Sequence, residues 1–264
     1  MIVTDTPGHP TAGLPYHHTR IRGIPALITP PFTQWVAPLL SQGQERSHIL
    51  SLLSALPRAA ILDLCLKADT DLHLVESGLP LALKYSYVVP VAASTDQLRA
   101  GYSEGLRRNL RQAEKIYSTA ESADIPGFLS LCQQSYAQQK IRPPHWLNTV
   151  VPAVFEGLQT HQCGNLVMAF SQDKPIAGIL TARDQTTSYY LAGGRTGDEQ
   201  GASAHALLLD QAIRAAHDQG TAFDFEGSMH PGIANFFQSF GAIPISYWHL
   251  RKFRGAGRLW SLFH

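Results

Sequence analysis

Hydrophobic and polar positions follow two periodicities along this chain, one typical of strands and one typical of helices, and both are clearest in its second half. Alternating or continuous apolar runs of five to ten residues predict strands, and apolar residues spaced three and four apart predict helices. We expect strands at residues 116–120, 165–170, 175–183, 188–192, 222–226 and 243–252. We expect helices at residues 124–140, 143–160, 203–219 and 231–241. The resulting order, β-α-α-β-β-β-α-β-α-β, is that of an α/β fold.

One layout in this pattern occurs twice. Residues 58–91 and residues 221–253 each read as a strand, a short loop, a short helix ending in glycine, and a long final strand. The offset between the two copies is about 160 residues, the size of an ordinary domain. The corresponding positions are Asp63 with Asp224 and Gly78 with Gly241. The match is one of layout with few identities, and it predicts two similar folding units.

Composition and charge narrow the class of protein. The 264 residues, 44% of them hydrophobic, suffice for one large core or two small ones. A formal net charge of +1 gives no overall field that would favour DNA or an anionic membrane as the main partner. No apolar run approaches the roughly 20 residues of a membrane span. Cys65, Cys132 and Cys163 are widely separated, which is typical of reduced thiols, so we expect a cytoplasmic protein.

Two long motifs carry a resemblance to a known family. Residues 102–115, YSEGLRRNLRQAEK, form a basic helix, and residues 223–242, FDFEGSMHPGIANFFQSFGA, form a strand and a short helix. The segment PPFTQW at residues 30–35 is similar to one in bacterial members. With the predicted order of elements, the chain resembles the GNAT acyltransferase superfamily, and more narrowly its double-domain branch of Fem-like peptidyl and acyl transferases.

The resemblance implies tandem GNAT-like domains, each a mixed central sheet flanked by helices. We expect a partial N-terminal domain at residues 1–93, a connecting basic helical segment at 94–115, and a complete C-terminal domain at 116–264. Two complete units need roughly 300 residues at ordinary domain size. The first domain is therefore expected to be truncated, without its opening strand and helices.

The resemblance also implies where an acyl donor binds. GNAT enzymes hold the pyrophosphate of acyl-CoA at the N-terminus of their third helix, where unpaired N–H groups and the helix dipole favour an anion. The matching loop here is residues 195–205, but Asp198 stands where Arg or Gln belongs and Ser203 where Gly or Ala belongs. Ser203 is expected to cap the helix. A plain turn with a helix cap is the alternative. The candidate donor-binding residues are Arg195, Gly201, Ala202, Ser203, Ala204 and His205.

Acyl transfer to an amine needs a group that accepts the proton of the amine. Asp224 and Glu226 are expected on one face of a strand, and Glu226 ends that strand near Ser228, where a cleft is expected to open. Glu226 is our candidate base, and Asp224 is either a second catalytic carboxylate or a partner of the loop backbone. Phe237 stands where many GNAT enzymes have a tyrosine acid, and Tyr190 is the candidate to supply a hydroxyl instead.

The basic helix offers a second candidate surface. Arg108, Arg111 and Lys115 share one helical face by their spacing of three and four. This face either binds the phosphates of a substrate or is simply solvated. Fem-like substrates include aminoacyl-tRNA and nucleotide-linked precursors, both anionic, so the resemblance favours Arg108 and Arg111 as substrate-binding residues, together with Ser228 and Phe237 near the cleft.

These features favour an acyltransferase that moves an acyl or aminoacyl group from a thioester or ester donor to an amine acceptor. The donor is acyl-CoA or aminoacyl-tRNA, and the acceptor is a small molecule or a peptide. A degenerate GNAT-fold binding module without turnover is the alternative, and RNA binding through the basic helix is a third. The histidines and cysteines show no metal-ligand spacing, so no metal is expected.

Overall fold

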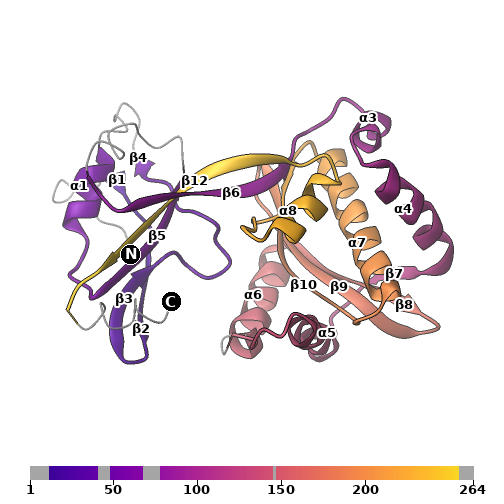
Figure 1. Cartoon of the computed structure of the whole chain (residues 1–264), viewed down its shortest axis with the longest axis horizontal. Coiled ribbons are helices and arrows are strands. Elements are labelled where there is room, and N and C mark those ends of the chain that lie inside the picture. The colour runs from indigo at the N-terminus through magenta and orange to yellow at the C-terminus, as the bar shows by residue number, and fades with distance from the viewer. Residues whose placement is uncertain (1–11, 41–47, 68–77, 145–146, 256–264) are drawn as a thin grey trace. The chain divides into compact units, whose positions relative to one another are not determined.

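The computed structural model describes residues 12–40, 48–67, 78–144 and 147–255 (Figure 1). The chain divides into two compact units. Unit 1 comprises Met1–Ser86 with Ile245–His264, and unit 2 comprises Tyr87–Pro244. This division differs from the boundaries expected from the sequence, because the basic helical segment belongs to unit 2 and most of the final strand belongs to unit 1.

Unit 1 contains a sheet with the strand order β2-β3-β5-β12 and a separate pair, β1 and β4. β3 runs parallel to β5, and β12 runs antiparallel to β5. Its core is a cluster of leucines in which Leu52 of the helix packs with Leu64 and Leu250 of the sheet. The elements are β1 (Ala12–Gly13), β2 (His17–Ile21), β3 (Ile24–Ile28), β4 (Leu39–Leu40), α1 (His48–Ala55), β5 (Ile61–Lys67) and β12 (Ile243–Phe253).

Unit 2 contains a sheet with the strand order β6-β11-β10-β9-β8-β7, in which only β10 and β11 are parallel. The order predicted for the second half is confirmed from β7 to β12. The strands are β6 (Leu81–Val89), β7 (Ser118–Glu121), β8 (Gly164–Ser171), β9 (Lys174–Arg183), β10 (Thr187–Arg195) and β11 (Ala222–Asp224). The helices are α3 (Thr95–Ala100), α4 (Glu104–Ile116), α5 (Ile125–Gln138), α6 (Leu147–His161), α7 (Glu199–Asp218) and α8 (Pro231–Gln238).

Helices cover both faces of the sheet in unit 2 (Figure 1). On one face, Ile179 of β9 belongs to the same buried cluster as Leu207 and Leu208 of α7. On the other face, Gly178 lies so close to α5 that an added Cβ would be 2.9 Å from the ring of Phe128. Successive residues of β9 therefore face opposite helical layers, as strand geometry requires. This packing fixes α7 beside β10 and β11, where the candidate site lies.

In the structure, each of the two stretches expected to share a layout pairs its final strand with the other stretch. β6 ends the first copy and pairs with β11 of the second, with Val88 opposite Asp224. β12 ends the second copy and pairs with β5 of the first, with Arg251 opposite Asp63. Gly78 and Gly241 both adopt left-handed backbone, with φ of +68° and +73°, a conformation that favours glycine. The short helix expected in the first copy falls on residues 68–77, which lie outside the described residues.

Candidate functional site

Five residues expected at the site line one hollow in unit 2. The hollow has a volume of about 310 Å³ and is lined by side chains of β10, α7 and α8 together with the end of α5. A wider hollow of about 760 Å³ shares Ala202, Gly232 and Phe236 with it and continues along α7 past Ser203. The five residues are Tyr190, Arg195, Ala202, His205 and Phe237.

Tyr190 and His205 are joined at the centre of this hollow. The hydroxyl of Tyr190 lies 3.1 Å from Nε2 of His205. A bulge in β10 between Tyr190 and Ala192 puts Tyr190 on the same side as Gly193. A Cβ at Gly193 would lie 2.6 Å from Nε2 of His205, so only glycine leaves room for the pair. Sequence periodicity misses this arrangement because a bulge breaks the alternation of the strand.

Both members of this pair are neutral at pH 7. Burial raises the pKa of Tyr190 far above the ordinary value, so its hydroxyl keeps its proton. Burial, followed by the positive charge of Arg195, lowers the pKa of His205 to about 4. Either Tyr190 donates to Nε2 of His205, or the imidazole N–H donates to the phenol oxygen, depending on the tautomer. The hollow therefore presents polar, uncharged groups beside the single cation Arg195.

Phe237 forms part of the wall behind this pair. Its ring stacks on Phe225 with centroids 4.3 Å apart, and it meets the ring of Tyr190 edge-on at 6.5 Å. Only 5% of Phe237 is exposed. The residue packs the aromatic core and has no proton to donate. A direct role for it in substrate binding stays a prediction.

Helix α7 begins earlier than the sequence suggests. Its N-cap is Asp198, whose Oδ1 accepts a hydrogen bond from the backbone N–H of Gly201 at 2.9 Å and from the hydroxyl of Thr196 at 2.8 Å. The prediction that Ser203 caps this helix is therefore wrong. Asp is as good a cap as Ser, and the strong helix formers that follow Asp198 extend the first turn. Ser203 lines the wider hollow instead, and Ala204 is fully buried.

The start of α7 does not fit a pyrophosphate. Hydrogen bonds from the Gly201 N–H and the Thr196 hydroxyl lower the pKa of Asp198, so a carboxylate already occupies the positive end of the helix dipole. Glu199 adds a second acid in the first turn. Gly201 is explained by the loop itself, because a Cβ there would lie 2.6 Å from the carbonyl oxygen of Thr196. An acyl-CoA bound in the usual GNAT manner would meet repulsion here.

The chain leaves the sheet directly after Asp224. β11 ends at that residue, and Glu226 has left-handed backbone with φ of +57°. The expectation that Asp224 and Glu226 share a strand face is therefore wrong, since strand alternation stops before Glu226. Oδ1 of Asp224 instead accepts a hydrogen bond from the backbone N–H of Glu226 at 2.8 Å. A left-handed, non-glycine residue costs conformational energy, and such residues are enriched at functional sites.

The pKa of the Glu226 carboxyl group is strongly displaced from its ordinary value. Burial, followed by the charge of Asp224, raises this pKa to about 8. The group is therefore largely protonated at pH 7 and becomes a carboxylate in the range where an amine acceptor is deprotonated. Ser228 follows in the same loop, and its hydroxyl accepts a hydrogen bond from the backbone N–H of His230 at 3.1 Å. Neither Glu226 nor Ser228 is among the described residues that line the two hollows, so the roles of Glu226 as a base and of Ser228 in binding stay predictions.

Two predicted substrate-binding residues, Arg108 and Arg111, lie apart from the hollow on α4. Both are exposed, and neither has an ion-pair partner among the residues that the structure describes. Within the same described ranges, no group of three or more His, Cys, Asp or Glu residues is placed to hold a metal ion. None of the helices found there is long and apolar enough to cross a membrane.

The sheet of unit 2, with α7 beside the parallel strands β10 and β11, defines a GNAT-type acyltransferase fold. The family model of the acetyltransferase (GNAT) domain matches residues 100–235, about half of the chain, and the chain belongs to this family. No curated protein matches the sequence at a significant level.

Solved structures extend the likeness to nearly the whole chain. FemX is 11% identical with a TM-score of 0.64, and the alignment covers 94% of this chain and 87% of FemX. A protein described as the C-terminal domain of a lysylphosphatidylglycerol synthetase from Agrobacterium fabrum is 13% identical with a TM-score of 0.61, covering 96% and 84%. L-PGS from Bacillus licheniformis is 12% identical with a TM-score of 0.55, covering 93% and 82%. At these identities the likeness is one of fold alone.

Proposed function

We propose that this chain transfers an acyl or aminoacyl group from an ester or thioester donor to an amine acceptor. Membership of the GNAT family supports transferase chemistry. The observation that carries the proposal is Glu226, a carboxyl group in strained backbone whose pKa is raised to about 8. A base with a pKa near the working pH is suited to accept a proton from an attacking amine.

The proposed reaction assigns a role to each group. The amine nitrogen attacks the carbonyl carbon of the donor, Glu226 accepts the amine proton, and the ester oxygen or thioester sulfur leaves with the electron pair of the broken bond. Tyr190 or His205 donates a hydrogen bond to the carbonyl oxygen as its negative charge develops. When the imidazole N–H of His205 donates to the phenol oxygen, the hydroxyl proton of Tyr190 is free to donate to the carbonyl oxygen.

The start of α7 bears on the donor. The carboxylate of Asp198 occupies the helix end where GNAT enzymes bind pyrophosphate, so we favour a donor whose phosphates lie elsewhere. An aminoacyl ester such as aminoacyl-tRNA meets this condition, and Arg108 and Arg111 are exposed cations for its phosphates. The proposed acceptor is a small-molecule or peptide amine. The proposed setting is the bacterial cytoplasm, in line with the free thiols of Cys65, Cys132 and Cys163.

We further propose that unit 1 is a reduced copy of the GNAT unit. The exchange of final strands and the left-handed conformation of both Gly78 and Gly241 support this tandem origin.

A non-catalytic binding module is the second candidate, favoured by two departures from GNAT enzymes. Asp198 blocks the usual donor position, and Phe237 replaces the usual tyrosine acid. A chain that kept the fold and lost turnover would tolerate both changes.

Transfer assays with two kinds of donor distinguish these functions. The purified chain is mixed with labelled aminoacyl-tRNA or with acyl-CoA and a panel of amines, and amide formation is measured. We expect amide formation from an aminoacyl ester, and a loss of about 10²- to 10⁴-fold in Glu226→Gln at an unchanged melting temperature at pH 5. Glu156→Gln, which removes an exposed carboxylate from α6 outside the lining of both hollows, is the matched control and should retain activity.

Two results would count against the proposal. Full activity in Glu226→Gln would remove Glu226 from the mechanism. A wild-type chain that melts cooperatively but transfers from neither donor would favour the binding module.

A further inference from the structure

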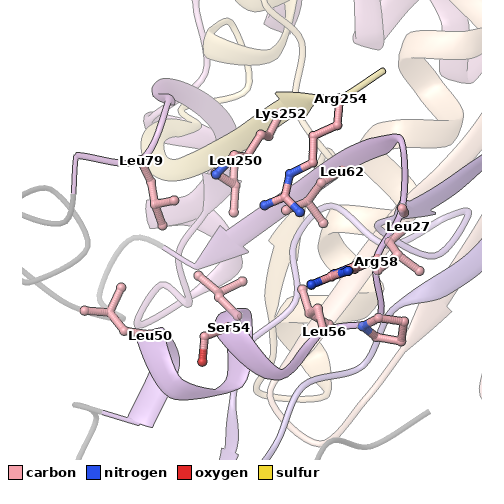
Figure 2. Close-up of a pocket in the computed structure, with 13 residues that line it drawn as sticks. Leu27, Leu50, Ser54, Leu56, Arg58, Leu62, Leu79, Leu250, Lys252 and Arg254 are labelled. Atoms are coloured by element: carbon pink, nitrogen blue, oxygen red, sulfur yellow. The ribbon is translucent and has the colours of Figure 1, made fainter. Parts of the chain in front are cut away.

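Unit 1 contains a cavity that the transfer reaction does not use. Its volume is about 480 Å³, within the range of about 300–1,000 Å³ that is usual for small-molecule sites. Figure 2 shows side chains of α1, such as Leu50 and Ser54, on one side of the cavity and those of β12, such as Leu250, on the other. The cavity lies between the helix and the sheet of this unit.

The walls of this cavity are aliphatic. Of the thirteen described residues that line it, seven are leucines. Leu27 and Leu250 are fully buried at its base, whereas the leucines nearer to solvent remain partly exposed. Exposed aliphatic surface costs about 25 cal/mol per Å², so covering it with an aliphatic ligand is favourable.

Three cations line the same cavity, and two of them, Arg58 and Arg254, are exposed to solvent. Leu250 and Lys252 occupy alternate positions of β12, Arg254 follows at the same spacing, and all three line the cavity. Arg58 contributes a third cation from the segment between α1 and β5. Among the residues that the structure describes, the lining contains no Asp or Glu and none of the three cations has an ion-pair partner. One strand therefore runs from a buried leucine to exposed positive charge.

We propose that this cavity binds a single-chain amphiphile with an anionic head, in which the aliphatic chain lies among the leucines and a carboxylate or phosphate contacts Arg58, Lys252 and Arg254. The apolar base and the cationic rim match the two ends of such a molecule. The site is independent of Glu226, Tyr190 and His205, so it stands whether or not the transfer reaction does.

Calorimetric titration of the full chain with dodecyl phosphate, kept below its critical micelle concentration, tests the site. We expect saturable binding with one molecule per chain. Butyl phosphate has the same head with a short chain, and dodecyltrimethylammonium has the same chain with a cationic head. Both should bind at least about tenfold more weakly, because each lacks one of the two matched parts.

Two pairs of variants locate the binding. Ser54→Trp fills the cavity from an exposed helical position, and Ser51→Trp, on the same helix but outside the lining, is its control. We expect loss of binding in the first and wild-type affinity in the second.

The triple variant with Arg58→Gln, Lys252→Gln and Arg254→Gln should bind about tenfold more weakly. Its control is the triple variant with Arg20→Gln, Arg22→Gln and Lys84→Gln, three cations of unit 1 that do not line the cavity.

Three results would overturn the proposal. The first is no binding of dodecyl phosphate by the wild-type chain. The second is equal weakening by Ser54→Trp and Ser51→Trp, or by the two triple variants. The third is binding to anionic vesicles only, unaffected by Ser54→Trp, which would indicate surface attraction to a membrane without use of the cavity.

Discussion

Two aspartates at corresponding positions of the repeat lie in opposite electrostatic surroundings. In the first copy, Asp63 accepts a hydrogen bond from Nε of Arg251 at 3.0 Å and lies 2.6 Å from Nε2 of His249. In the second copy, Asp224 accepts the backbone N–H of Glu226 and lies close enough to raise the pKa of that carboxyl group. Asp63 therefore lies beside a cation, Arg251, whereas Asp224 lies beside a second acid, Glu226.

The exchanged strands account for this difference. Arg251 of β12 stands opposite Asp63, whereas Val88 of β6 stands opposite Asp224. Burial alone would raise the pKa of Asp63, but the hydrogen bonds and charges of His249 and Arg251 outweigh it and lower that pKa. Val88, which stands opposite Asp224 on β6, carries no charge. We infer that the first copy uses its aspartate for stability, whereas in the second copy the charge of Asp224 acts on the pKa of Glu226.

The largest expected effect comes from breaking the ionic cluster of the first copy. Asp63→Ala removes the carboxylate that Arg251 and His249 share, and hydrogen bonds to charged groups are worth about 1.5–3 kcal/mol each. We expect a loss of about 2–3 kcal/mol of unfolding free energy, measured by denaturant titration at pH 7, with transfer per folded molecule unchanged. Because the pKa of Asp63 is lowered on folding, this contribution is present at neutral pH and lost as pH falls through the folded pKa. Unchanged stability would mean that the cluster is solvated.

The next effect concerns the pH dependence of the second copy. If Glu226 acts as a base with a pKa of about 8, transfer should rise about tenfold between pH 7 and pH 9, and this rise should be absent from Glu226→Gln. The unfolding free energy should fall over the pH range in which the rate rises. Folding raises the pKa of Glu226 from 4.5 to about 8, so the contribution of this group to stability is complete below pH 4.5 and is lost as pH rises through about 8. A flat rate profile over this range would contradict the assignment.

The sequence predicts features that depend on residues close together in the chain, and it misses features that depend on contacts between distant residues. The order of the elements follows from local periodicity, and the structure agrees with it. The correspondence in sequence between Asp63 and Asp224 follows from the repeated layout. The cap at Asp198 was missed because Asp198 and Ser203 are both good caps, and only tertiary packing selects one.

The chemistry of the candidate site depends on features that periodicity does not contain. The bulge after Tyr190 and the left-handed backbone at Glu226 both break the strand alternation from which side-chain directions were expected. The neighbours Val88 and Arg251 come from strands distant in sequence, so the contrast between the two aspartates is visible only in the fold.

A smaller effect on the pH dependence of transfer is expected when a cation is introduced opposite Asp224. Val88→Arg places a guanidinium opposite Asp224, as Arg251 stands opposite Asp63. Its charge should lower the pKa of Glu226 and move the rate profile to lower pH by about one unit, since an opposite charge nearby favours the ionised form. The measurement is the rate profile of the variant, with Val88→Gln as the uncharged control. A profile that both variants move equally would indicate altered packing and no effect of charge.

The smallest effect is expected from removing the charge of Asp224 and keeping its shape. Asp224→Asn retains an oxygen that accepts the backbone N–H of Glu226, so the loop should keep its conformation. Burial is the larger cause of the raised pKa of Glu226 and Asp224 the smaller, so the midpoint of the rate profile should fall by less than in Val88→Arg. The rate at pH 7 should then rise by a small factor, because more of Glu226 is ionised there. A rate that falls at every pH would instead make Asp224 a participant in the reaction beyond its effect on Glu226.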